Sequence, residues 1–150
     1  MDRSTLFLPP EGERRDLKVV GEVIRVLADA SQTGSYEVFE QHGPEGAGPP
    51  PHTHAWDEAY FMLEGEMDVL LGDRMVVLKP GAFVHIPGGT PHFFRYRAGG
   101  GRFVSMTSRG GASGFFGALA EALPDGRVDI PKVVGVAESH GVRLAGPPPG

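Results

Sequence analysis

Two histidines one residue apart, His52 and His54, stand in a proline-rich stretch and are followed by a glutamate, Glu58. In a strand, residues two apart share a face with Cβ atoms roughly 6–7 Å apart, so both imidazoles project to the same side. Two imidazoles at that spacing can converge on one ion through metal–nitrogen bonds of about 2.0–2.1 Å. The pattern therefore predicts a metal site.

Glu58 is in phase with the two histidines, but on one straight strand it would lie about 13 Å beyond His54. It can share their ion only if the chain turns within residues 55–57, so that Glu58 opens the next antiparallel strand. A fourth ligand is expected from His92, which a Pro-Gly-Gly turn delivers to the start of another strand. The chain has no cysteine, so any metal must be held by nitrogen and oxygen ligands.

Short strand-like runs, separated by turn sequences rich in Gly and Pro, must position these residues. The 23 Gly and 14 Pro are spread along the chain rather than repeated. Because no helical pattern interrupts the runs before residue 110, they predict an all-β antiparallel sandwich or barrel. The expected strands cover residues 17–30, 36–41, 52–54, 58–64, 67–71, 74–78, 83–86, 92–97 and 102–107.

After residue 110 the pattern changes to that of helices. Residues 113–123 carry an apolar stripe at helical spacing, with Ser113 as the expected N-cap and Pro124 as the stop. Residues 131–141 predict a second short helix, with a proline near its start and a glycine past its end. The remaining residues, 142–150, should form an extended tail.

Length and charge predict one domain with a core of its own, and they limit the classes of partner. We divide the 150 residues into an N-terminal arm (1–16), a barrel (17–110) and C-terminal helices and tail packed on the barrel (111–150). A net charge of −5 and a pI near 5.6, without a basic stripe, argue against a nucleic-acid partner. No apolar run could span a membrane and the first residues lack a signal-peptide pattern, so we expect a cytoplasmic protein without a membrane partner.

Two stretches resemble the two sequence motifs of the cupin superfamily, in the right order and about fifteen residues apart. The first motif is matched by Gly46, His52, His54, Glu58 and Gly65 at the expected spacings. The second is matched by Gly81, Pro87, Gly89 and His92. One position departs from the second motif, because Tyr96 stands where the family has an asparagine.

The resemblance implies a double-stranded β-helix, or jelly-roll barrel, and one divalent metal ion per chain with two coordination positions open. The ligands that it implies are His52, His54, Glu58 and His92. Three imidazoles and a carboxylate suit several ions, of which we favour Fe, Mn or Ni, with Zn or Cu possible. The helical tail resembles that of small single-domain bacterial cupins described as quercetin 2,3-dioxygenase-like, and the family likeness implies a homodimer.

Apolar and aromatic side chains near the site are the candidates for a substrate pocket. They suit a small-molecule substrate that is aromatic or enolisable, and the three tyrosine hydroxyls among them could position it. We expect the helix that carries Phe115 and Phe116 to pack on the outer sheet, with a lid over one barrel mouth as the alternative. The pocket candidates are Tyr36, Phe39, Tyr60, Met62, Phe94, Tyr96 and Met106.

Three functions fit these residues. The leading one is a metal-dependent oxygenase of the dioxygenase type, in which a substrate enolate or phenolate binds the ion and Glu58 shifts partly off it to act as the base. The second is a non-redox isomerase, cyclase or lyase with the same four ligands. The third is a cupin that binds a small ligand without catalysis.

Overall fold

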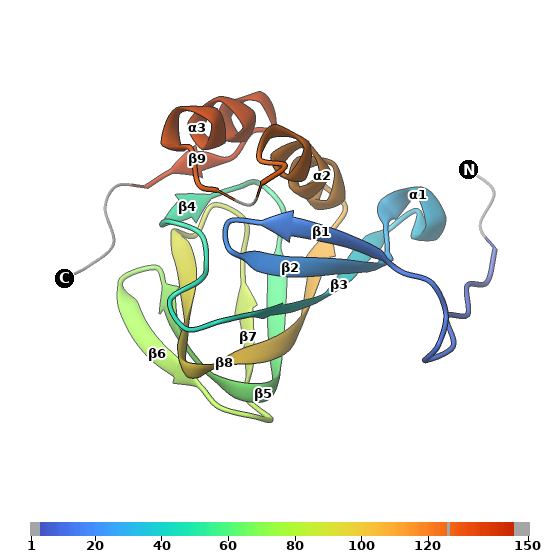
Figure 1. Ribbon diagram of the computed structural model, residues 1–150, viewed down its shortest axis with the longest axis horizontal. Coiled ribbons are helices and arrows are strands. Elements are labelled where there is room, and N and C mark those ends of the chain that lie inside the picture. Colours follow the sequence, from blue (N-terminus) through green and yellow to red (C-terminus); the bar gives the residue numbers. More distant parts are fainter. Residues whose placement is uncertain (1–3, 126, 146–150) are drawn as a thin grey trace.

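The computed structural model describes residues 4–125 and 127–145, which fold into nine strands and three helices (Figure 1). Each of these strands pairs antiparallel with its neighbours in one continuous hydrogen-bonded sheet. The strands are β1 (Arg15–Val19), β2 (Glu22–Ala28), β3 (Tyr36–Gly43), β4 (His52–Thr53), β5 (Glu58–Leu71), β6 (Arg74–Leu78), β7 (Phe83–Ile86), β8 (His92–Ser108) and β9 (Arg143–Leu144). The helices are α1 (Ala30–Thr33), α2 (Ala112–Ala122) and α3 (Ile130–Ser139).

Two long strands, β5 and β8, run through both layers of the fold and join them. In one layer the order is β1-β2-β3-β8-β5-β7, formed by the first half of β5 and the second half of β8. In the other layer the order is β9-β4-β8-β5-β6, formed by the remaining halves. The architecture confirms the predicted all-β cupin fold, although the strand pairings do not close into a ring among the described residues.

Three of the expected strand boundaries are wrong. Residues 17–30 form a hairpin rather than one strand, because Val20 and Gly21 both adopt positive φ angles, 48° and 84°, in a two-residue turn. The pairs of strands expected over 58–71 and 92–107 are each continuous. They bend where Gly65 pairs with Gly101, next to Gly100, whose carbonyl oxygen leaves no room for a Cβ on Gly65.

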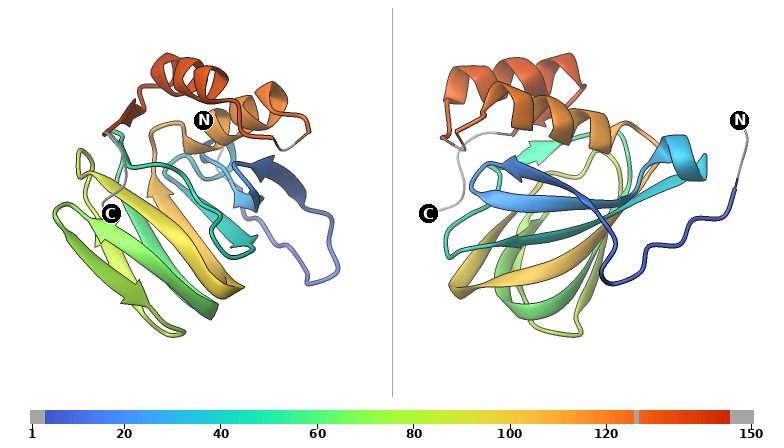
Figure 2. Two further views of the ribbon diagram at one scale, coloured as in Figure 1. Left: turned by 60° about the vertical axis from the view of Figure 1, so that its left-hand side comes forward. Right: turned by 45° about the vertical axis from the view of Figure 1, so that its right-hand side comes forward.

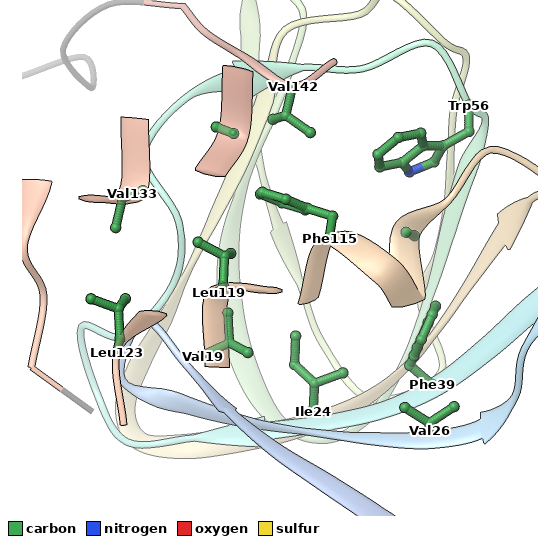
Figure 3. Close-up of a cluster of buried hydrophobic side chains, with 12 residues drawn as sticks. Val19, Ile24, Val26, Phe39, Trp56, Phe115, Leu119, Leu123, Val133 and Val142 are labelled. Atoms are coloured by element: carbon green, nitrogen blue, oxygen red, sulfur yellow. The ribbon is translucent and has the colours of Figure 1, made fainter. Parts of the chain in front are cut away.

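Both C-terminal helices form as predicted, but their position differs from the expected one. The N-cap of α2 is Gly111 rather than Ser113, whose backbone N–H instead donates to Glu37 Oε1 at 3.0 Å. Figure 2 shows both helices over one end of the sheets, not on the outer face. Side chains of α2, including Phe115 and Leu119, pack there with Phe39 and Ile24 of the sheet (Figure 3). The two helices therefore act as a lid, which we call the helical cap.

The two ends of the chain differ in how they are held. Residues 4–14 contain no helix or strand, and Leu6 and Phe7 in this arm are exposed. At the other end, β9 pairs with β4, while the rest of the expected tail, residues 146–150, lies outside the described residues. Within the described ranges no helix is long and apolar enough to cross a membrane.

Candidate metal centre

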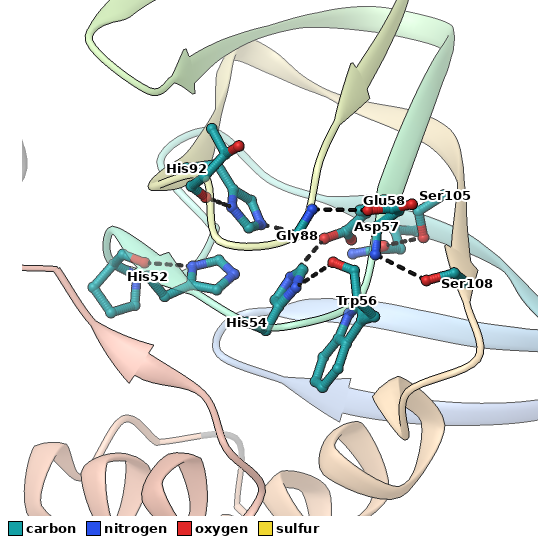
Figure 4. Close-up of polar contacts among 12 residues, drawn as sticks. His52, His54, Trp56, Asp57, Glu58, Gly88, His92, Ser105 and Ser108 are labelled. Carbon is teal, nitrogen blue, oxygen red and sulfur yellow. Dashed lines mark hydrogen bonds and ion pairs between the residues drawn. The ribbon is translucent and has the colours of Figure 1, made fainter.

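The candidate metal centre lies where β4, the turn after it and the starts of β5 and β8 meet (Figure 4). His52 opens β4 and is paired with His92, the first residue of β8. The chain bends over residues 54–57, and Glu58 then opens β5 beside them, as the spacing required. The three histidines form a group whose ligating nitrogens all lie within 4.8 Å of one another.

The turn between His54 and Glu58 is fixed by contacts from distant parts of the chain. The backbone N–H of Asp57 donates to Ser108 Oγ at 2.9 Å, and its carboxylate accepts from Gly88 N at 2.8 Å. Gly88 lies so close to the carbonyl oxygen of Ala55 that a Cβ would not fit. These contacts hold the carboxylate of Glu58 beside the histidines.

Each histidine ring is oriented by a backbone carbonyl. The Nδ1 atoms of His52, His54 and His92 lie 2.9, 3.0 and 2.8 Å from the carbonyl oxygens of Pro50, Trp56 and Thr90. Because a carbonyl oxygen can only accept, each Nδ1 must carry the proton. The three Nε2 atoms are therefore free to bind a metal, and this outer hydrogen bond is the arrangement that metal-binding histidines commonly show.

The position of Glu58 supports the same interpretation. Its Oε2 lies 3.0 Å from His54 Nε2 and 3.2 Å from His92 Nε2. If both imidazoles are neutral, lone pairs face lone pairs across these distances, which is unfavourable unless a cation lies between them. Two ligand atoms at right angles about one ion, with bonds of about 2.1 Å, lie about 3 Å apart. The donor set therefore fits a divalent ion.

Burial and neighbouring charges set the ionisation of the centre. Burial alone would raise the pKa of Glu58. In the absence of an ion, His54 and His92 rings that carry a second proton on Nε2 donate to its carboxylate, and these hydrogen bonds and charges outweigh burial and lower the pKa to about 2. Burial, helped by the charge of His92, lowers the pKa of His52 to about 3. At neutral pH the site thus offers an ionised carboxylate and a neutral imidazole, the forms that bind metals.

A cavity of about 60 Å³ adjoins these side chains and is covered by the helical cap. Its walls combine the centre with aromatic and aliphatic side chains from the sheets and from the cap. This is the lid arrangement, so the favoured expectation that the Phe115 helix packs on the outer sheet is wrong. Besides His52, His54 and Glu58, the lining includes Glu22, Gln41, Trp56, Tyr60, Phe94, Phe115, Phe116, Leu119 and Val133.

Comparison with known proteins identifies the family. The profile of a family described as "Cupin domain" matches residues 39–104, the stretch that carries all four side chains of the centre. Residues 39–104 of this chain therefore form a cupin domain.

The relatives of this cupin are distant. A quercetin 2,3-dioxygenase of Bacillus subtilis (strain 168) is 29% identical over 115 residues, which cover 75% of this chain but only 34% of that protein. The structure of an RmlC-like cupin from Shewanella frigidimarina NCIMB 400 superposes with a TM-score of 0.62 at 17% identity, covering 69% of this chain and 91% of that one. The polyketide cyclase RemF from Streptomyces resistomycificus gives 0.60 at 24% identity, covering 69% and 80%. These structural likenesses show the fold alone.

The pocket residues expected for this cupin divide into three groups. Tyr60 and Phe94 line the cavity. Phe39, Met62 and Tyr96 are buried in the core but are not among the lining residues. Tyr36 and Met106 are 47% and 48% exposed on the outer face of the sheet, so their assignment to the pocket is wrong. In a strand, residues an odd number of positions apart point to opposite faces. Tyr36 is three residues from the inward-facing Phe39, and Met106 lies between the buried Ser105 and Thr107, so both point outward.

Sequence reasoning missed three polar or aromatic residues of the site. Trp56 stacks on His54, with ring centroids 4.2 Å apart and planes 10° from parallel, so it fixes the plane of that imidazole. Glu22 and Gln41 line the cavity from β2 and β3. The alternation of Glu22 with the buried Ile24 and Val26 could have revealed that Glu22 points inward, once the turn before it was recognised.

Proposed function

We propose that this cupin is a metal-dependent enzyme that acts on a small molecule, and that it is an oxygenase for an aromatic or enolisable substrate. The observation that carries the proposal is the group of His52, His54 and His92, with Glu58 Oε2 beside the Nε2 atoms of His54 and His92, next to a covered cavity whose wall includes His52, His54 and Glu58. The aromatic side chains of Tyr60, Phe94 and Phe115 in the same wall suit a flat apolar substrate. The similarity to a quercetin dioxygenase supports this choice but covers only a third of that protein.

The centre would hold one divalent ion through His52, His54, Glu58 and His92. Nitrogen and oxygen ligands without a thiolate favour Fe, Mn or Ni, while Zn or Cu would also be accepted. When bound, such an ion would acidify a hydroxyl of an enol or phenol and hold the reactants together. The chain itself supplies Glu58, whose carboxylate would take up the proton that the substrate hydroxyl loses. The helical cap would keep water away from that proton transfer.

The experiment that tests the oxygenase is oxygen consumption by Fe(II)-loaded protein with a panel of phenols and diketones. Uptake of O₂ that depends on one of these substrates supports the proposal. The matched variant His54→Ala, which removes one ligand, should lose both the metal and the oxygen uptake. Oxygen uptake that survives this substitution would contradict the assignment of the chemistry to the centre.

A non-redox reaction is the second candidate, because the similar polyketide cyclase RemF shares the fold and the same ligand types serve either chemistry. Turnover of substrate under argon at the rate seen in air would favour this candidate over the oxygenase. A third possibility is a binding module without catalysis. Ligand binding that persists in His54→Ala would favour that reading.

We further propose that this cupin forms a homodimer through the outer face of one sheet layer. Four large apolar side chains are exposed there on β3, β5, β7 and β8, which are neighbouring strands. Their exposed fractions are high for side chains of this kind, and a second copy would cover them. They are Tyr36 (47%), Phe61 (44%), Phe83 (63%) and Met106 (48%).

A further inference from the structure

Glu22, at the start of β2, is a second carboxyl group in the cavity that the metal centre does not use. It is only 4% exposed, and it lines the same cavity as His52, His54 and Glu58. Its Oε2 is buried and has no hydrogen-bond partner among residues 4–125 and 127–145. An unpartnered polar atom in a closed interior costs about 1–3 kcal/mol, so a natural protein keeps one there only for a reason.

A hydrogen-bonded chain fixes the orientation of this carboxyl group. Ser105 Oγ, which is fully buried, donates to Gln41 Oε1 at 2.6 Å. The amide of Gln41 is thereby turned so that its Nε2 donates to Glu22 Oε1. Because Oε1 is occupied, Oε2 is the atom left for a ligand.

The surroundings of Glu22 favour the protonated acid. Burial, opposed by the hydrogen bond from Gln41 and helped by the charge of Glu58, raises the pKa of Glu22 to about 8. Burial therefore favours the neutral, protonated form of this carboxyl group. Since Oε1 accepts from Gln41, the proton resides on Oε2, which becomes a hydrogen-bond donor.

We propose that Glu22 is a second polar anchor for the substrate, whose Oε2–H donates a hydrogen bond to a carbonyl or carboxylate oxygen of a small molecule held at the metal centre. The inference rests on the proposed function, since it requires a substrate in this cavity. It narrows the substrate class to molecules with two oxygen-bearing ends: an enol or phenol for the centre, and a hydrogen-bond acceptor for Glu22. Glu22 contacts this second end and takes no part in holding the ion.

The test compares small probes that share a metal-binding end and differ in the second oxygen. Catechol carries only the first end, whereas 2,3- and 3,4-dihydroxybenzaldehyde add a carbonyl acceptor in two different positions. Zn(II)-loaded protein under argon avoids redox chemistry, and calorimetry measures each dissociation constant. The wild-type protein should prefer one of the aldehydes over catechol by about fivefold, the contribution of one ordinary hydrogen bond.

Two variants separate hydrogen bonding from structure. Glu22→Gln keeps an acceptor for Gln41 and a donor for the ligand, so the aldehyde preference should survive. Glu22→Met keeps the size but removes the donor, so the preference should disappear while catechol affinity and zinc content stay at the wild-type level. A preference that is absent in the wild-type protein, or that persists in Glu22→Met, would overturn the anchor. If catechol itself does not bind to the Zn(II)-loaded wild-type protein, the proposed function is contradicted instead.

Infrared spectroscopy keeps the proposal testable if Glu22→Met does not fold. The difference spectrum between the wild-type protein and Glu22→Gln should contain the carbonyl stretch of a protonated carboxylic acid. This band should shift when the preferred aldehyde replaces catechol. An ionised carboxylate in its place, or a band that ignores the change of probe, would contradict the anchor.

Discussion

Truncation of Leu119 tests whether the helical cap is an integral part of the fold. Leu119 lies on α2, is 3% exposed, and belongs to the cluster that joins the cap to Val19, Ile24 and Phe39 of the sheets. It also lines the cavity above the metal centre. Leu119→Ala should therefore remove buried methyl groups at a place where the neighbours are held by three strands and two helices.

The expected loss follows from the burial. Replacing a buried leucine by alanine costs about 2–5 kcal/mol, and the existing cavity beside Leu119 leaves little scope for collapse, so we expect about 3 kcal/mol. For a domain of this size each kcal/mol lowers the melting temperature by about 2–4 °C, which gives a decrease of about 6–12 °C. The free energy of unfolding should be measured by urea titration of metal-free protein, so that metal binding does not add to the stability.

Ile130→Ala is the matched control for this measurement. It removes as many carbon atoms from α3, at a side chain that is 60% exposed, and should change the free energy of unfolding by less than about 0.5 kcal/mol. If Leu119→Ala costs no more than Ile130→Ala, the cap does not pack on the sheets as described. The cavity would then be open, and the helical cap could not exclude water from it.

Three further predictions concern the centre, the cavity and the outer sheet. Trp56→Leu, which removes the ring stacked on His54, should weaken metal binding roughly tenfold in a competition titration, whereas Trp56→Phe should change the affinity little. Equal metal affinities of Trp56→Leu and the wild-type protein would show that Trp56 does not position His54. Because the folded-state pKa of Glu22 is raised from 4.5 to about 8, the folded protein binds more protons than the unfolded chain between these values, and stability should fall as pH rises through this window. Between about pH 5.5 and 7.5 the free energy of unfolding of metal-free wild-type protein should fall, relative to that of Glu22→Gln, by up to about 1.4 kcal/mol per pH unit. If urea titrations give the two proteins the same dependence of unfolding free energy on pH, this prediction is contradicted. Phe83→Glu should convert a dimer to monomers in sedimentation velocity, while Met75→Glu on β6 should not; a monomeric wild-type protein would exclude the proposed interface.

The ligands of the candidate centre were predictable because their geometry is mostly local. His52 lies on β4, His54 follows directly after that strand, and a bend over residues 54–57 suffices to bring Glu58 back to them. Only His92 comes from a distant segment, and its place at the start of a strand after a tight turn is visible in the sequence. Strand period and turn chemistry are short-range properties, so one sequence is enough to find them.

The pocket walls were less predictable because they depend on register and on tertiary packing. The size and apolar character of Tyr36 and Met106 favour a place inside the barrel, but the alternation of buried and exposed residues along β3 and β8 puts both side chains outside. Strand β5 continues through Gly65, which fits against the carbonyl oxygen of Gly100, 35 residues away in the chain, because it has no Cβ. The cap could not be located from its apolar stripe, since the stripe shows that α2 is buried on one side but not which surface it covers.

The metal content of protein purified without chelator tests the central claim most directly. Elemental analysis should find close to one divalent ion per chain in the wild-type protein, and almost none in His54→Ala prepared in parallel. A wild-type protein that carries no ion, and whose melting temperature does not respond to added Fe(II), Mn(II), Ni(II) or Zn(II), would contradict the account.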